Sequence, residues 1–168
     1  MDLSAWLHAA RRSAFRRGLL NLVLWRSIPF NWPHRLRVVP QHEGGMRVDI
    51  PFRRANHNHI RGIHACCLAT AAELCSGLAL MEQLDAKRHR LIMKSIAMDY
   101  HWQAKGAARA MFRVDAETLE RHVKQALARE EAALYVAEVA VHDTQGRHLA
   151  TGRITWQIKP WSAVRTGV

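Results

Sequence analysis

The sequence predicts an α+β fold in which a largely antiparallel sheet packs against one long helix. Three observations lead to this prediction. Segments with alternating apolar and polar residues, the period of half-buried strands, recur on both sides of residues 64–82. Residues 64–82 themselves form one long apolar segment that is rich in small side chains and has the length of a helix. Turn-forming residues separate the alternating segments from one another.

The length and composition of the chain narrow its class. A chain of 168 residues is long enough to bury a core and predicts one main domain. Its 25 lysines and arginines against 14 acids give a net charge of +11, which favours an anionic partner such as nucleic acid, acidic lipid or a phosphorylated ligand. The 3 cysteines form no disulfide framework, so a reducing, cytoplasmic setting is expected.

Residues 1–32 are predicted to form an amphipathic helix that packs on the domain and ends near Pro29 and Pro33. Residues 1–40 hold seven arginines and one acid, Asp2. The apolar stretch within residues 19–25 is too short to span a bilayer. A transit peptide, or a helix that makes peripheral contact with a membrane, is the alternative. Residues 33–160 are assigned to the main domain and residues 161–168 to a loose tail.

The elements of the main domain follow from periodicity and from turn residues. Asp115 is expected to cap the second helix, and residues 143–146 have the composition of a hairpin turn. The predicted order is strands at 36–41 and 46–52, a helix at 64–82, strands at 91–102 and 108–114, a helix at 115–127, and strands at 135–141 and 150–158.

Glu73 is the only charged residue between Ala65 and Met81. Burying a lone carboxylate is costly, so such a group either finds a partner or has a raised pKa. One interpretation is therefore structural, with one of the many arginines paired to Glu73. The other is functional, with Glu73 as a general base or nucleophile in a water-poor site.

The residues before this helix supply the other parts of an acyl-hydrolysis site. Residues 58–62 form a loop, and the backbone N–H groups of Ala65 and Cys66, at the helix start, have no acceptor within the helix. Such groups, together with the helix dipole, stabilise a developing oxyanion.

The histidines and cysteines next to the helix suggest no metal site. His57, His59, His64 and Cys66 lack a recognised ligand spacing with a second pair downstream. A cysteine nucleophile would need a base directed at it, and the sequence shows none.

Residues 58–65, NHIRGIHA, with Glu73 nine residues after His64 and Gly77 beyond it, resemble the signature of hotdog-fold thioesterases. The similarity is to the phenylacetic-acid-pathway type and to an uncharacterised thioesterase-like branch. Residues 72–79 (AELCSGLA), residues 28–31 (IPFN) and Thr155-Trp156 also resemble that branch. The resemblance extends over residues 28–160.

This resemblance implies a hotdog fold, in which a curved antiparallel sheet wraps a central helix. It also implies at least a homodimer, with a tetramer as the larger alternative, active sites at the dimer interface, and acyl-CoA thioesters as substrates. Coenzyme A then arrives as part of the substrate, and no resident cofactor is expected.

By position, the resemblance assigns roles to individual residues. Glu73 activates water or attacks the carbonyl, and Asn58 orients it. His64 is a further catalytic candidate that can help to hold the loop, and Gly62 is counted among the substrate-binding residues. The amides of Ala65 and Cys66 polarise the thioester oxygen. The remaining candidates are Ser95, as an assisting hydroxyl on the next strand, and three arginines for the phosphates of coenzyme A, namely Arg53, Arg54 and Arg61.

Two other functions stay open. A hotdog dehydratase of 3-hydroxyacyl thioesters would pair His59 with Glu73, fourteen residues later, but the His-Phe-Pro signature of such enzymes is absent. A non-catalytic protein that binds acyl-CoA or lipid is the second, because Ala65-Cys66 stands where many active members have two glycines. Specific nucleic-acid binding is not expected, since no recognised motif accompanies the charge.

Overall fold

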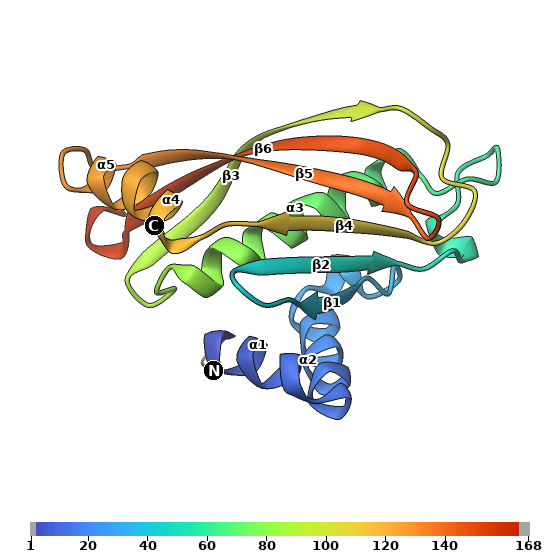
Figure 1. The fold of residues 1–168 in the computed structure, drawn as a ribbon, viewed down its shortest axis with the longest axis horizontal. Helices are drawn as coiled ribbons and strands as arrows, with labels where there is room; N and C mark the ends of the chain where they lie inside the picture. The colour runs from blue at the N-terminus through green and yellow to red at the C-terminus, as the bar shows by residue number, and fades with distance from the viewer. Residues whose placement is uncertain (1–2, 165–168) are drawn as a thin grey trace.

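A six-stranded antiparallel sheet curves around helix α3 (Ala65–Gln83), as the predicted α+β class requires (Figure 1). The computed structural model describes residues 3–164. The strand order is β1-β2-β4-β5-β6-β3. The strands are β1 (Arg37–Pro40), β2 (Gly45–Ile50), β3 (His89–Tyr100), β4 (Ala108–Arg113), β5 (Ala133–Asp143) and β6 (His148–Pro160). The central helix inside a curved sheet confirms the expected hotdog arrangement.

Small side chains on α3 let the sheet approach the helix closely. Ala71, Ala72 and Ala79 have no exposed surface. Gly77 lies so close to β6 that a Cβ atom there would be 3.0 Å from Trp156 Cη2. By length and composition α3 could also cross a membrane. Here, however, most of its length is enclosed by the sheet, which explains its apolar character.

The two edges of the sheet differ. Helix α2 (Ala14–Ser27) covers the β1 edge, because the Asn21 side chain accepts from Val38 N–H at 2.6 Å and donates to Val38 C=O at 2.9 Å. These bonds occupy groups that a neighbouring strand would otherwise take. The β3 edge has no such cover among the described residues, and Ile92 and Met93 on it are more than 40% exposed.

The N-terminal helix expected over residues 1–32 packs on the domain but is divided in two. The segment forms α1 (Leu3–Arg12) and α2, and Ser13 between them caps α2 by accepting from Arg16 N–H at 3.3 Å. The break lets both helices bury apolar residues, Leu7 and Ala10 on α1 and Leu20 and Leu24 on α2. Arg11 fixes α1 to the end of α3 through a largely buried ion pair with Glu82 at 2.5 Å.

Short elements complete the chain: η1 (Pro29–Asn31), η2 (Arg54–Asn56), α4 (Ala116–Leu119), a π-helical stretch η3 (Glu120–Lys124), α5 (Gln125–Leu127) and η4 (Trp161–Ala163). Asp115 caps α4 as predicted, accepting from Thr118 N–H at 2.7 Å. The loose tail predicted for residues 161–168 is partly wrong, because Trp161 Nε1 donates to Ala86 C=O at 3.0 Å. Residues 165–168 lie outside the described part of the chain.

Candidate functional site

A cleft of about 430 Å³ opens beside the first turns of α3 and contains the Glu73 side chain. Its other walls come from η1 and from the edge strand β3, which brings together segments distant in sequence. Most of its surface is apolar. The lining includes Ile28, Phe30, Leu74, Met93 and Ile96, with Asn31, Thr70, Cys66 and Tyr100 adding polar atoms.

Glu73 is half-buried in this cleft and unpaired there. Within residues 3–164 its carboxylate makes no ion pair and no hydrogen bond. Hence the arginine partner of the structural interpretation is not found. Burial raises the pKa of Glu73 above its usual value of 4.5, since a low-dielectric surrounding disfavours the charged form. A desolvated carboxylate beside an open cleft is equipped to take a proton from water.

Asn31 shares the cleft with Glu73, and the sequence alone assigned it no role. Asn31 is 4% exposed, and its Oδ1 atom is buried without a hydrogen-bond partner among the described residues. Buried polar atoms are normally satisfied, so such an atom needs an explanation. A signal was present in the sequence, because Asn31 ends the IPFN stretch that resembles the thioesterase-like branch.

The start of α3 offers one free amide where two were predicted. The His64 Nδ1 atom caps the helix by accepting from Cys66 N–H at 3.1 Å, which assigns the ring proton to Nε2. The Cys66 amide is therefore occupied, and the oxyanion role predicted for it is not available in this arrangement. The Ala65 N–H has no backbone or side-chain acceptor in the described part of the chain.

Tyr100 on β3 lines the cleft and contacts the first residue of α3. Its hydroxyl donates to Ala65 C=O at 3.1 Å. Burial and the neighbouring Cys66 thiol raise the pKa of Tyr100, so the hydroxyl stays protonated and keeps donating. This bond fixes the first residue of α3 against the edge strand.

The loop before α3 holds its own shape through Asn58. Asn58 Oδ1 accepts from Ile60 N–H at 3.1 Å and from Gly62 N–H at 2.9 Å. A Cβ on Gly62 would come within 2.8 Å of Gln103 Nε2, so a larger residue here would displace the exposed Gln103 side chain. Asn58 and the exposed His59 do not line the Glu73 cleft. One chain thus does not join the predicted loop residues to the predicted acid.

Asn56, to which the sequence alone assigned no role, connects the segments around the start of α3 through buried hydrogen bonds. It is 1% exposed and donates to His34 C=O at 3.0 Å and to Pro51 C=O at 2.9 Å. Its own carbonyl accepts from His64 N–H at 2.7 Å, which places the helix cap. Nothing in the NHNH run distinguishes this buried asparagine from Asn58, since both are flanked by similar residues.

The remaining candidates lie on the surface. Arg53, Arg54 and Arg61 are exposed and make no ion pair among residues 3–164, so their positive charge is available to an anion. Ser95 is exposed next to a β-bulge in β3 and does not line the cleft. In this chain its hydroxyl is therefore not placed to assist at Glu73.

The buried cysteines of α3, Cys67 and Cys75, are poor candidates for a nucleophile. Burial and the neighbouring Cys66 raise the pKa of Cys67 to about 11, and burial raises that of Cys75 further. Both thiols stay protonated at neutral pH and are poor nucleophiles. Among residues 3–164 no three His, Cys, Asp or Glu side chains are arranged to hold a metal ion.

Comparison with solved structures places this arrangement in a known fold. A Pseudomonas aeruginosa protein of unknown function, described as a probable thioesterase, is 27% identical with a TM-score of 0.77, covering 85% of this chain and 95% of its own. A thioesterase variant from the same organism is 11% identical with a TM-score of 0.67, covering 83% and 91%. A Haemophilus influenzae thioesterase is 9% identical with a TM-score of 0.63, covering 78% and 82%. The last two show the fold alone.

Sequence comparison supplies the family. No curated protein matches the chain significantly. The profile described as "Domain of unknown function (DUF4442)" matches residues 16–158, which include most of α2, the IPFN stretch, Glu73 and the sheet up to the last two residues of β6. Given this match and the hotdog thioesterases among its structural neighbours, the chain belongs to the DUF4442 family of the hotdog-fold, thioesterase-like superfamily.

Proposed function

We propose that the protein hydrolyses acyl thioesters, with acyl-CoA as the substrate and Glu73 as the general base. The observation that carries the proposal is the unpaired, half-buried Glu73 carboxylate in an apolar cleft at the N-terminal part of α3. An apolar cleft suits an acyl chain, and burial keeps a carboxylate basic enough to accept a proton from water.

Hydrolysis requires the removal of a proton from water and the replacement of the carbon–sulfur bond by a carbon–oxygen bond. The Glu73 carboxylate removes a proton from water, and the water oxygen attacks the thioester carbonyl carbon. Negative charge then develops on the carbonyl oxygen. Ala65 precedes Glu73 by about 12 Å along α3 and does not line the Glu73 cleft, so in this scheme its N–H stabilises the oxyanion from a second copy of the chain. The carbon–sulfur bond breaks, the coenzyme A thiolate leaves, and the acyl group leaves as a carboxylic acid.

Asn31 is assigned a positioning role in this scheme. It lines the cleft with Glu73, and within residues 3–164 its Oδ1 has no hydrogen-bond partner that would hold it for structural reasons. A side-chain amide can donate to a carbonyl oxygen and accept from water at once. It is thus suited to orient either reactant beside Glu73.

The proposal includes a homodimer formed along β3. That edge has free backbone groups and exposes apolar side chains, among them Ile92 and Met93, and an open edge of this length is a template for pairing. Met93, Ile96 and Tyr100 of the same strand line the Glu73 cleft. A second copy would therefore border the site and could supply the loop residues that one chain keeps away from Glu73.

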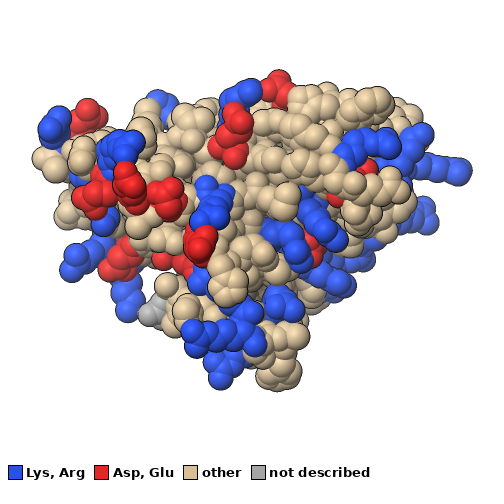
Figure 2. Space-filling model, in the orientation of Figure 1, with Lys and Arg blue, Asp and Glu red and all other residues tan. Residues whose placement is uncertain are grey.

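The exposed arginines near the loop are proposed to hold the phosphates of coenzyme A. Arg53, Arg54 and Arg61 make no ion pair among residues 3–164, and a guanidinium group can donate two parallel hydrogen bonds to phosphate oxygens. Figure 2 shows basic side chains at the right-hand end of the molecule, where Figure 1 places the loop before α3.

Release of free thiol from a panel of acyl-CoAs of increasing chain length tests the proposal. The wild type should release thiol from at least one member, and Glu73→Ala should lower that rate by about a hundredfold or more, the range of general-base catalysis. Glu130→Ala, which changes an exposed glutamate in the loop between α5 and β5, serves as the matched control. Equal rates for wild type and Glu73→Ala on every member would remove the proposal.

One observation favours binding without turnover as a second candidate. His64 occupies the Cys66 amide, which leaves a single backbone donor for an oxyanion. Tight acyl-CoA binding by calorimetry with no thiol release would establish this alternative. Loss of activity on 3-hydroxyacyl thioesters in His59→Ala would instead indicate the dehydratase.

A further inference from the structure

Helix α2 has two apolar faces, and only one of them packs on the protein. Leu20, Asn21 and Leu24 are buried against the domain. On the opposite face, Phe15 is 82% exposed, Leu22 45% and Leu19 40%. These three side chains are four and three residues apart in sequence, so they form one stripe along the outer face of the helix.

The charged side chains of α1 and α2 are all basic. The sequence has no Asp or Glu between residues 3 and 42. Arg12, Arg16 and Arg26 are exposed and, within residues 3–164, have no carboxylate partner. Figure 2 shows blue and no red side chains over the lower part of the molecule, where Figure 1 places α1 and α2.

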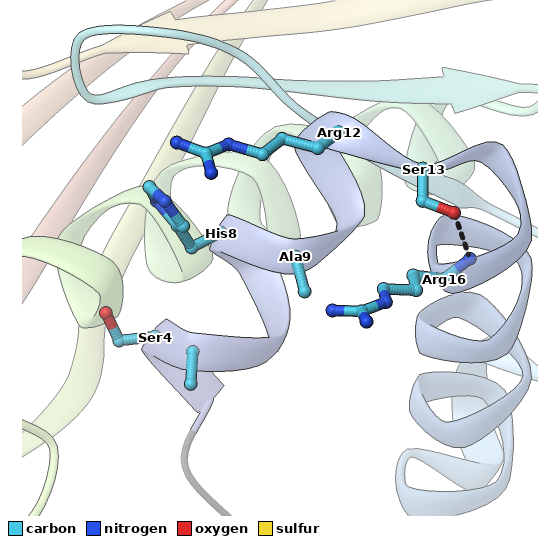
Figure 3. Close-up of a pocket in the computed structure, with 7 residues that line it drawn as sticks. Ser4, His8, Ala9, Arg12, Ser13 and Arg16 are labelled. Carbon is cyan, nitrogen blue, oxygen red and sulfur yellow. Dashed lines mark hydrogen bonds between the residues drawn. The ribbon is translucent and has the colours of Figure 1, made fainter.

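An open groove of about 860 Å³ lies between the two helices next to the stripe. Its polar lining comes from Ser4, His8, Arg12, Ser13 and Arg16. Figure 3 shows the Arg16 side chain reaching from α2 across the gap towards Ala9 of α1. Two guanidinium groups with nearby hydroxyls are the donors that a phosphate group requires.

Apolar surface directly adjoins the groove between α1 and α2. A second groove of about 320 Å³ shares Arg16 with the first and is lined by Trp6 and Leu19. The same side chain thus borders a polar groove and an apolar one. This is the order of groups met at the boundary between lipid headgroups and acyl chains.

The two helices present this surface without needing to fold on contact. Asn21 bonds α2 to β1, and the largely buried Arg11–Glu82 pair holds α1 to α3. A rigid surface loses little conformational entropy on binding. The pair of helices α1 and α2, the α1–α2 hairpin, is therefore a docking surface that is already folded before it binds.

We propose that the α1–α2 hairpin docks on the surface of an anionic phospholipid bilayer. Phe15, Leu19 and Leu22 enter the headgroup region, and Arg12 and Arg16 hold lipid phosphates. A second copy is disfavoured as occupant, because a two-fold contact on this face would place the arginines against one another. Nucleic acid offers phosphates but leaves the apolar stripe on α2 without a partner.

Co-sedimentation of the full chain with vesicles tests the docking surface. The wild type should bind vesicles of phosphatidylcholine with 30% phosphatidylglycerol and bind pure phosphatidylcholine weakly. Arg12→Gln/Arg16→Gln should weaken anionic-vesicle binding by about tenfold or more, since each arginine at such a surface contributes appreciably. Phe15→Ser/Leu19→Ser should weaken it by a similar factor, since the apolar stripe would no longer enter the headgroup region.

Matched controls separate this surface from general basicity. Lys105→Gln/Arg129→Gln removes two exposed cations elsewhere, and Leu134→Ser removes a leucine that is 50% exposed on β5. Both should bind as the wild type does. Equal binding of neutral and anionic vesicles, or full binding by either hairpin variant, would overturn the proposal. Failure of the wild type to bind anionic vesicles would also overturn it. A lower oligomeric state of Phe15→Ser/Leu19→Ser in that case would identify a second copy as the occupant.

Discussion

The indole Nε1 of Trp156 donates a hydrogen bond to Ser76 Oγ at 3.0 Å, joining β6 to the middle of α3. The Ser76 hydroxyl in turn lies 3.1 Å from the carbonyl oxygens of Ala72 and Glu73. The sheet is therefore bonded to the helical turn that carries the proposed base.

Ser76→Ala should lower the free energy of unfolding by about 1–3 kcal/mol, because the buried indole N–H would lose its acceptor. Denaturant unfolding measures the change. Ser27→Ala, at an exposed position, is the control and should change stability by less than about 0.5 kcal/mol. An equally small effect of Ser76→Ala would mean that the bond contributes nothing.

Gly77→Ala and Gly18→Ala form a matched pair with opposite expected signs. A Cβ at Gly77 would lie 3.0 Å from Trp156 Cη2, whereas a Cβ at Gly18 meets nothing within 4 Å. We expect Gly77→Ala to destabilise by about 1–3 kcal/mol through overpacking and Gly18→Ala to stabilise by up to about 1 kcal/mol through helix propensity. Thermal unfolding of both variants checks this. A stabilising Gly77→Ala would show that α3 and β6 are not tightly packed there.

The cost of burying Glu73 should appear in the pH dependence of stability. Its pKa in the folded state is raised above 4.5 by burial, so the folded chain keeps this proton to a higher pH than the unfolded chain does. The destabilising contribution of Glu73 is thus absent below pH 4.5 and appears as the pH rises through the folded-state pKa. Glu73→Gln should gain stability over the wild type in that direction.

Unfolding of wild type and Glu73→Gln between pH 4 and pH 8 measures this difference. Glu130→Gln at an exposed site should show a difference that does not grow with pH. A Glu73→Gln variant that is less stable than the wild type at pH 8 would indicate a stabilising partner for the carboxylate.

Asn31→Ala separates a positioning role from a structural one. Its Oδ1 has no partner to lose among the described residues, so the variant should be as stable as the wild type or more so. Its kcat/KM for acyl-CoA should fall by about tenfold, the value of one hydrogen bond of about 1.4 kcal/mol. Reduced stability with unchanged kcat/KM would assign Asn31 to the scaffold.

Periodicity was enough to predict the α+β class, because most strands and α3 obey local rules, whereas the hotdog arrangement was implied by the resemblance. The alternation of Met46, Val48 and Ile50 matches the buried positions of β2, and the small residues of α3 match the close approach of the sheet. The break at Ser13 was missed, since a serine in an arginine-rich amphipathic segment looks compatible with one continuous helix. Only the burial of both helices against the domain makes its capping bond favourable.

The candidate site was predicted in part. The isolated position of Glu73 in an apolar segment was a strong local signal, and the cleft beside it agrees with that signal. The occupied amide of Cys66 and the buried Asn31 and Asn56 depend on contacts between distant segments, which no spacing in the chain encodes. Whether Asn58 reaches a Glu73 carboxylate depends on a second copy, which lies beyond what one sequence specifies.

The pH dependence of kcat/KM for thiol release tests the central claim most directly, comparing wild type with Glu73→Gln on the best acyl-CoA. The wild-type value should rise with pH through an apparent pKa above 4.5, the direction that burial gives Glu73, and Glu73→Gln should lose that rise together with about a hundredfold or more in rate. A Glu73→Gln profile that coincides with the wild-type profile would contradict the account.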